Sequence, residues 1–270
     1  ESDKRVMVFY GKHVGNDLYM RVSTNPEDIS SFAAEVSLYS QLGGYRKWTY
    51  TNPVQLTSET DDPIYLFFRE HDNLNEAWWV FSTSADGGAT WGARTQLHHH
   101  AYSKVATNGA DRIDMAFSNH PDSGNTKIWH IYYSGGQWHH SDGTAVSALP
   151  IPSAELDAHS VVYDGTPSRT WIWDIAYDAS GSPVIVFAKF VSTSDHRYYY
   201  ATQAAGVWSA KEIVAAGGWI PSTVEYPPGT YQYYYSGGVY LDHNDANTVY
   251  LSKVTDGQFE IFRGKTPDGG

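Results

Sequence analysis

The chain has 270 residues, 18 Lys and Arg against 30 Asp and Glu, a formal net charge of −12, and no cysteine. The negative charge argues against DNA or RNA as a partner, and the lack of cysteine excludes disulfides and thiolate metal sites. No apolar run approaches the roughly 20 residues of a membrane-spanning helix, so we expect no membrane partner.

The composition predicts an all-β chain. Aromatic residues make up 15% of the sequence, and 24 glycines and 12 prolines supply turns. Aromatic side chains favour strands, and no long segment repeats its apolar residues at the helical period. The sequence predicts one short helix, from Asn25 to Ala34, where Pro26, Glu27 and Asp28 suit a first helical turn.

A repeated turn organises the chain. The segment from Ser84 to Trp91 fits the pattern S-x-D-x-G-x-T-W of an Asp-box. In such a turn the Asp side chain caps backbone amides, glycine permits the tight path and the Trp packs between neighbouring sheets. Weaker versions follow predicted strands at 18–22, 131–133, 198–201 and 249–251.

These turns predict a β-propeller built from four-stranded antiparallel blades, since roughly 50 to 70 residues per unit fits one blade with long loops. Five units are expected: Arg5 to Tyr39, Trp48 to Leu97, Tyr102 to Val146, Val161 to Val214, and Tyr233 to Gly270. We expect residues 1–270 to form one domain, truncated where 266–270 begins another Asp-box and stops. Truncation at the N-terminus and a complete five-bladed ring are the alternatives left open.

Histidines concentrate between Arg112 and Gly143. Two predicted strands, 113–118 and 127–134, are joined by a polar turn that places His120 at the mouth of a hairpin. His130 lies in the return strand, where a packed core ring is the alternative to a ligand-binding one. Titratable rings gathered at one end of a β-unit indicate a ligand site.

Several motifs together resemble the BNR-repeat polysaccharide-degrading propellers, which include ulvan lyases, related rhamnose-glucuronate lyases and some α-L-rhamnosidases. The motifs are Pro63 to Arg69 before the Asp-box, Asn119-His120-Pro121 followed by Ile128 to Tyr133, Trp171 to Ala176, Asp195 to Tyr198, and Tyr235 to Asp242. The family is usually a seven-bladed propeller, so the resemblance implies that about two blades are lacking. The histidine-asparagine motif of the rhamnosidase branch is not visible.

The resemblance implies a site of two histidines about twenty residues apart, with a Tyr and an Arg from the next blade. His120 matches one histidine, and its partner is one of His98, His99 and His100, of which His100 or His99 fits the spacing best. The tyrosine is Tyr177, with Tyr163 and Tyr198 as rivals, and the arginine is Arg197, for which pairing with Asp195 or Asp174 is the structural alternative. Substrate contacts are expected from four further residues: Arg69, His130, Tyr198 and Trp129.

This set of residue types suits β-elimination from a uronate-containing polymer. Arginine can offset the carboxylate charge, neutral histidine can take the C5 proton, and tyrosine can protonate the leaving oxygen at C4. No carboxylate pair of the ordinary glycosidase kind stands out. We therefore predict a polysaccharide lyase acting on an ulvan-like, anionic rhamnose-uronate polymer. An α-L-rhamnosidase of the same fold and a non-catalytic glycan-binding propeller are the alternatives.

The predicted chemistry needs no cofactor. The run from Asp242 to Asp245 could supply oxygen ligands to a structural Ca²⁺, or a histidine to Zn²⁺, and an exposed turn is the alternative. A polymer-degrading enzyme of this kind is expected to be secreted or periplasmic, although the chain carries no signal peptide. The oligomeric state is left open.

Overall fold

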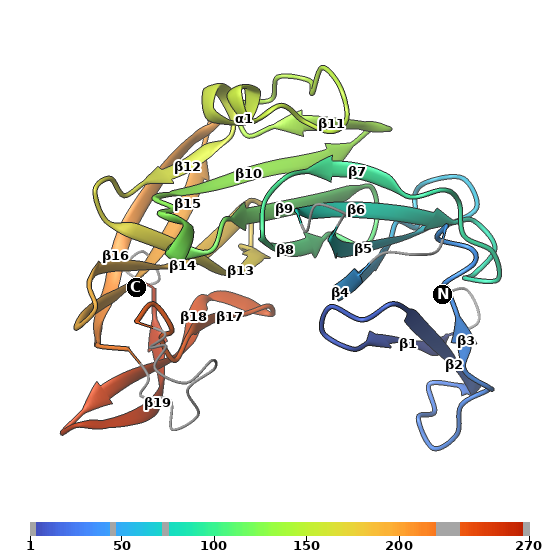
Figure 1. Ribbon diagram of the computed structural model, residues 1–270, viewed down its shortest axis with the longest axis horizontal. Coiled ribbons are helices and arrows are strands. Elements are labelled where there is room, and N and C mark those ends of the chain that lie inside the picture. Colours follow the sequence, from blue (N-terminus) through green and yellow to red (C-terminus); the bar gives the residue numbers. More distant parts are fainter. Residues whose placement is uncertain (1–3, 44–46, 72–75, 220–232, 267–270) are drawn as a thin grey trace.

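The protein is described from a computed structural model that covers residues 4–43, 47–71, 76–219 and 233–266. Five antiparallel sheets follow one another in chain order around an arc (Figure 1). Sheet 1 contains β1 (Arg5–Gly11), β2 (Leu18–Pro26) and β3 (Val36–Ser37), and sheet 2 contains β4 (Lys47–Gln55), β5 (Ile64–His71), β6 (Ala77–Ser84) and β7 (Thr95–His98). Sheet 3 contains β8 (Tyr102–Thr107), β9 (Arg112–Ser118), β10 (Lys127–Ser134), β11 (Gln137–His140) and β12 (Val161–Asp164). Sheet 4 contains β13 (Arg169–Tyr177), β14 (Pro183–Ser192), β15 (Asp195–Ala204) and β16 (Val207–Gly217), and sheet 5 contains β17 (Val239–Asp242), β18 (Asp245–Thr255) and β19 (Gln258–Lys265).

The first strands of the successive sheets line the inner side of the arc. Neighbouring members of the series β1, β4, β8, β13 and β17 contact one another. Figure 1 shows sheet 1 and sheet 5 at the two ends of the arc, with the arc open between them. The arrangement confirms the predicted β-propeller, with four strands in sheets 2 and 4, five in sheet 3, and three described strands in the first and last sheets.

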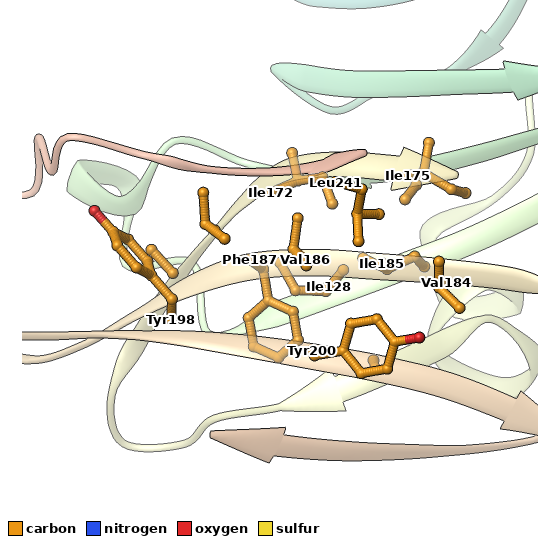
Figure 2. Close-up of a cluster of buried hydrophobic side chains, with 14 of the residues drawn as sticks. Ile128, Ile172, Ile175, Val184, Ile185, Val186, Phe187, Tyr198, Tyr200 and Leu241 are labelled. Carbon is orange, nitrogen blue, oxygen red and sulfur yellow. The ribbon is translucent and has the colours of Figure 1, made fainter. Parts of the chain in front are cut away.

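Strands in the middle of the blades form the core because both of their faces are covered. All residues of β5 except His71 are buried, and β14 has an unbroken buried run from Pro183 to Ala188. A strand buried on both faces has a continuous apolar sequence, which the segments IYLFF and PVIVFA supply. Figure 2 shows side chains of β13, β14, β15 and β17 packed together in the largest of these clusters.

The Asp-box forms the predicted turn. The Asp86 carboxylate accepts hydrogen bonds from the Thr90 backbone amide at 2.8 Å and the Thr90 hydroxyl at 2.6 Å. These bonds, with one from Ser84, lower the pKa of Asp86 to about 2. Trp91 is 7% exposed and meets the ring of Phe9 in sheet 1 edge-on at 5.7 Å between centroids. The Trp therefore packs between neighbouring sheets, as predicted.

The predicted helix at Asn25 to Ala34 is wrong. Strand β2 continues to Pro26, Glu27 has a φ of 53°, and the Asp28 carboxylate caps the Ser30 amide at 2.8 Å in a turn. Ser23 then bridges to Phe32 as an isolated β-bridge. The side chains that suit a helix start thus serve a turn instead.

The one α-helix of the described residues, α1 (Ser153–His159), lies between β11 and β12 and was not predicted. Strand β12 pairs with Lys127 to Trp129 of β10, whereas β11 pairs with Ile131 to Ser134. The prediction that Val161 begins the fourth blade is therefore wrong, because β12 completes the outer edge of sheet 3 that the short β11 leaves uncovered. The fourth blade begins at Arg169.

The predicted Asp-box at 266–270 lies outside the described residues except for Thr266. No helix of the described residues is long and apolar enough to cross a bilayer.

Candidate functional site

A cavity of about 360 Å³ opens on the inner side of the arc. Each of the inner strands β4, β8 and β13 contributes three consecutive residues to its wall, at 50–52, 102–104 and 171–173, and Tyr235 closes one side. The lining residues are Tyr50, Thr51, Asn52, Tyr102, Ser103, Lys104, Trp171, Ile172, Trp173 and Tyr235. A cavity with aromatic walls and few charges suits the faces and hydroxyls of sugar rings.

His120 stands beside this cavity in the connection between β9 and β10, as predicted for the hairpin mouth. It caps the short 3₁₀ helix η1 (Pro121–Ser123), with Nδ1 accepting the Asp122 amide at 3.1 Å. The same Nδ1 lies 3.4 Å from the Asp122 carboxylate. Asp122 therefore offers a partner to either neutral tautomer, and a proton on Nδ1 leaves the Nε2 lone pair free.

Three aromatic rings surround the His120 imidazole. Its centroid is 5.1 Å from that of Trp171, 5.7 Å from Tyr102 and 5.7 Å from Tyr235. Nε2 is 3.4 Å from the Tyr235 hydroxyl. The imidazole is therefore fixed on one nitrogen and faces a phenol with the other, which is the arrangement of a proton-transfer pair.

Two arginines flank His120, and among the described residues neither forms an ion pair with a carboxylate. Arg69, on β5, is 4% exposed; its guanidinium carbon is 4.5 Å from the Tyr50 ring centroid, and Nη1 donates to the Ala101 carbonyl at 3.1 Å. Its Nε is buried without a hydrogen-bond partner. Arg169, the first residue of β13, donates to the Pro121 carbonyl at 2.6 Å. A buried cation without a counter-ion is costly, so this site favours an anionic ligand.

The surroundings set the protonation states of the site. Burial lowers the pKa of His120, Asp122 raises it, and Arg69 and Arg169 lower it further, so the ring is held neutral. Burial raises the pKa of Tyr102 to about 12 and also raises that of Tyr235. The histidine is thus available as a base, while both phenols keep their protons and can act as acids.

Backbone irregularities aim the aromatic side chains at the cavity. Between the pairs Thr49↔Arg69 and Asn52↔Phe67, β4 carries a bulge in which Tyr50 has a φ of 59°. The bulge turns the Tyr50 ring towards the Arg69 guanidinium. A second bulge, in β13, lies at Trp173. The backbone of Gly238 passes close to Trp173, because a Cβ there would lie 2.9 Å from the indole.

The other predicted histidines have different surroundings. His98 is fully buried, and His100 is 4% exposed with its ring 4.5 Å from that of Trp129. Burial lowers the pKa of His100 to about 3. Trp129 is 7% exposed and donates to Asp157 at 3.0 Å. These three rings pack around Phe117 and are not among the residues that line the cavity.

His99 points to solvent. Its side chain is 43% exposed, with Nε2 2.7 Å from the Glu76 carboxylate and the ring 4.7 Å from that of Trp78. Neither Glu76 nor Trp78 lines the cavity or is among the rings around His120.

Tyr177 and His130 meet at a buried carboxylate instead of at the cavity. The Tyr177 hydroxyl donates to Asp114 at 2.5 Å, His130 Nε2 is 2.9 Å from the same carboxylate, and Arg112 binds it through two bonds of 2.7 Å. His130 Nδ1 is 2.8 Å from the Ser141 hydroxyl. His130 and Asp114 are both fully buried, so the predicted alternative of a packed His130 ring is confirmed.

Arg197 is held by carboxylates, as the structural alternative predicted. It donates to Asp195 at 2.9 and 2.8 Å and to Glu212 at 3.1 Å, so its charge is offset. Tyr198 is fully buried, and its hydroxyl accepts the Gly238 amide at 2.9 Å. His120 and Arg69 are the predicted site residues that the structure brings together beside the cavity.

The family of the chain is shown by its sequence. A family model described as BNR repeat-containing family member matches residues 1–216. The chain belongs to this BNR repeat-containing family. No curated protein sequence matches the BNR chain.

Solved structures share the fold of the BNR chain. An ulvan lyase of polysaccharide lyase family PL25, bound to -[GlcA(1-4)Rha3S]-, has a TM-score of 0.68 and 17% identity over 99% of this chain and 66% of its own. A second ulvan lyase structure of that family gives the same TM-score and coverage at 18% identity. A Hadza microbial sialidase has a TM-score of 0.48 and 12% identity over 92% of this chain and 44% of its own. The BNR chain thus spans 66% of the ulvan lyase chains that it resembles.

Sequence reasoning missed most of the cavity of the BNR chain. Arg169, Trp171 and Trp173 begin β13 at alternate positions, and this alternation was the signal that could have placed the arginine beside an aromatic wall. Tyr102 lies two residues after the last histidine of the triplet. Tyr50 carries no sequence signal, because a bulge in β4 brings it to the site. Tyr235 begins one of the family-like motifs, but nothing in that motif places it beside His120.

The residues proposed for a cation make separate contacts. Asp242 accepts the Asn244 amide at 3.0 Å, His243 Nε2 is 3.0 Å from Asp174, and Asp245 binds Lys265 at 2.9 Å. Within the described ranges, no group of three or more His, Asp or Glu side chains gathers as metal ligands would. A structural Ca²⁺ or Zn²⁺ stays a prediction.

Proposed function

We propose that this protein is a polysaccharide lyase that cleaves an anionic, ulvan-like rhamnose-uronate polymer by β-elimination. The proposal is carried by the pair Arg69 and Arg169, which have no carboxylate partner among the described residues and lie near a neutral His120 that faces the Tyr235 hydroxyl. The fold shared with the ulvan lyase structures is consistent with it.

The proposed binding mode places the uronate carboxylate between the two arginines. Guanidinium groups bind carboxylates through charge-assisted hydrogen bonds and lower the barrier to removing the proton next to that carboxylate. Arg197, whose charge Asp195 and Glu212 offset, is less suited to this task than Arg69 and Arg169. Trp171 and Tyr102 form walls against which the sugar ring can stack.

The proton steps then fall to His120 and Tyr235. The base is the tautomer whose proton is on Nδ1, where it faces the Asp122 carboxylate at 3.4 Å and Nδ1 no longer accepts the Asp122 amide. In this tautomer His120 takes the C5 proton at Nε2. The C5–H electron pair forms the C4–C5 double bond, the C4–O bond breaks, and Tyr235 donates its proton to the departing oxygen. The hydrogen bond of 3.4 Å between the two side chains allows the proton to return from His120 to Tyr235. Tyr235 thus takes the role that sequence reasoning gave to Tyr177, which donates to Asp114.

A polymeric substrate cannot cross a lipid bilayer, so the proposal also places the protein outside the cytoplasm, secreted or periplasmic. The chain covers 66% of the length of the ulvan lyase chains. The test therefore uses the longest natural protein that contains this sequence.

The test incubates this protein with ulvan and follows the ultraviolet absorbance of the unsaturated uronate together with free rhamnose. His120→Ala is compared with His159→Ala, a matched histidine that lies on α1 and pairs with Asp142 at 2.8 Å. We expect the absorbance to rise at similar rates with the wild type and His159→Ala. With His120→Ala the rate of this rise should be lower by a factor of about 10² or more. Release of rhamnose without absorbance would replace the lyase with an α-L-rhamnosidase, and neither product would leave a glycan-binding propeller.

A further inference from the structure

Lys104 lines the cavity and is a third cation near it, after Arg69 and Arg169, that pairs with no carboxylate among the described residues. It lies two residues beyond Tyr102 on β8 and on the same face of that strand, about 7 Å further along. Lys104 and Trp173 both line the cavity, and the ammonium lies 5.8 Å from the centroid of the Tyr240 ring. Within the described residues, the ammonium makes neither a hydrogen bond nor an ion pair.

The carboxylate of Asp174, whose charge acts on Lys104, is hydrogen-bonded to other groups. One of its oxygens accepts the Leu241 amide at 3.1 Å and lies 3.0 Å from His243 Nε2, and the other accepts the Ile175 amide at 3.0 Å. Its side chain is 13% exposed. Burial lowers the pKa of Lys104 while Asp174 raises it, so the ammonium is desolvated without the direct contact that would compensate.

We infer that Lys104 binds a second anionic substituent of the polymer, a sulfate ester or another carboxylate on the sugar next to the uronate. The inference rests on the proposed function and adds a preference for the substrate. The cavity runs along β8 and β13, so a chain whose uronate lies between Arg69 and Arg169 would place its neighbouring sugar against Trp173 and Lys104. An oxyanion there would supply the hydrogen bonds that the ammonium lacks.

Binding is measured by isothermal titration with three polymers: native sulfated ulvan, chemically desulfated ulvan and polyglucuronate. The wild type is compared with Lys104→Met and with Lys104→Arg, which keeps the charge. Lys189→Met is the matched control, because Lys189 also lies over tyrosine rings, at 5.7 Å from Tyr163 and 5.8 Å from Tyr199, but outside the cavity.

We expect Lys104→Met to weaken binding of native ulvan, of polyglucuronate or of both by about tenfold or more. Its effect on binding of desulfated ulvan should be less than about twofold. Lys104→Arg should restore most of the loss, and Lys189→Met should behave as the wild type. A loss confined to native ulvan identifies a sulfate, and a loss on polyglucuronate identifies a carboxylate.

Equal losses on all three polymers, or no loss on any, would overturn the inference. Formation of unsaturated product is measured separately on the same samples. Turnover with no dependence on Lys104 would reject only this inference, whereas charge-selective binding without unsaturated product would reject only the lyase.

Discussion

The buried carboxylate of Asp114 joins sheet 3 to sheet 4, and replacing it with asparagine should destabilise the protein. Its two oxygens accept hydrogen bonds from Arg112 and Tyr177 and contact His130, with no solvent exposure. An asparagine of the same size carries an amide NH2 group, which is a donor, in place of one acceptor oxygen. That NH2 group would face the donors of Arg112 or Tyr177, and the Arg112 guanidinium would lose its counter-ion.

The structure sets the magnitude of this effect. Burial alone would raise the pKa of Asp114, but hydrogen bonds from His130 and Arg112 outweigh burial and lower the pKa from 3.8 to about 2. Because a tenfold change in proton affinity is about 1.4 kcal/mol, the ionised carboxylate contributes about 2 kcal/mol to the free energy of unfolding. Removing one partner of a buried ion pair costs about 3 to 5 kcal/mol. We therefore expect Asp114→Asn to lower the free energy of unfolding by about 3 kcal/mol at neutral pH.

Urea unfolding followed by tryptophan fluorescence measures both quantities. The pKa of Asp114 is depressed in the folded state, so its contribution is present above the unfolded pKa of 3.8 and is lost as the pH falls through about 2. Asp111→Asn, an exposed neighbour, should change the free energy of unfolding by less than about 0.5 kcal/mol. Equal effects of the two substitutions on the free energy of unfolding would refute this reasoning. So would a loss of stability at acidic pH that is the same in the wild type and in Asp114→Asn.

Three further predictions address the site and the repeat. Arg69→Met should move the acidic limb of the rate profile to higher pH, because Arg69 lowers the pKa of His120; a profile that does not move would remove Arg69 from the electrostatics of the site. Trp91→Ala should lose about 3 to 5 kcal/mol in urea unfolding, because the indole fills the space against Phe9 between two sheets; a loss below about 1 kcal/mol would contradict that packing. His99→Ala should change turnover by no more than about twofold, because the side chain points to solvent, and a larger loss would return His99 to the list of site residues.

The repeat was predictable from sequence because its signal is local. An Asp-box fixes a turn through contacts within eight residues, and strands such as β5 and β14 contain continuous apolar runs, IYLFF and PVIVFA, because both faces are covered there. The same locality misled at Glu27, where residues typical of a helix start form a turn. Strand β12 could not be placed because its pairing with β10 depends on how much edge β11 leaves open.

The candidate site was only partly predictable because it is assembled across sheets. His120 was found through the hairpin turn that holds it, and Arg69 lies in a motif on a recognisable strand. Sequence alone could not show that Asp195 and Glu212 neutralise Arg197 while Arg169 has no carboxylate partner among the described residues. Such a difference depends on neighbours from other strands.

The most direct test of the central claim is the mass of the oligosaccharides that the protein releases from ulvan. Elimination leaves an unsaturated uronate at the new non-reducing end, so each product that carries this end is lighter by one water molecule than its counterpart from hydrolysis. The account predicts these lighter products with the wild type and their absence with His120→Ala. Products that carry the added water, or unsaturated products that persist in His120→Ala, would contradict it.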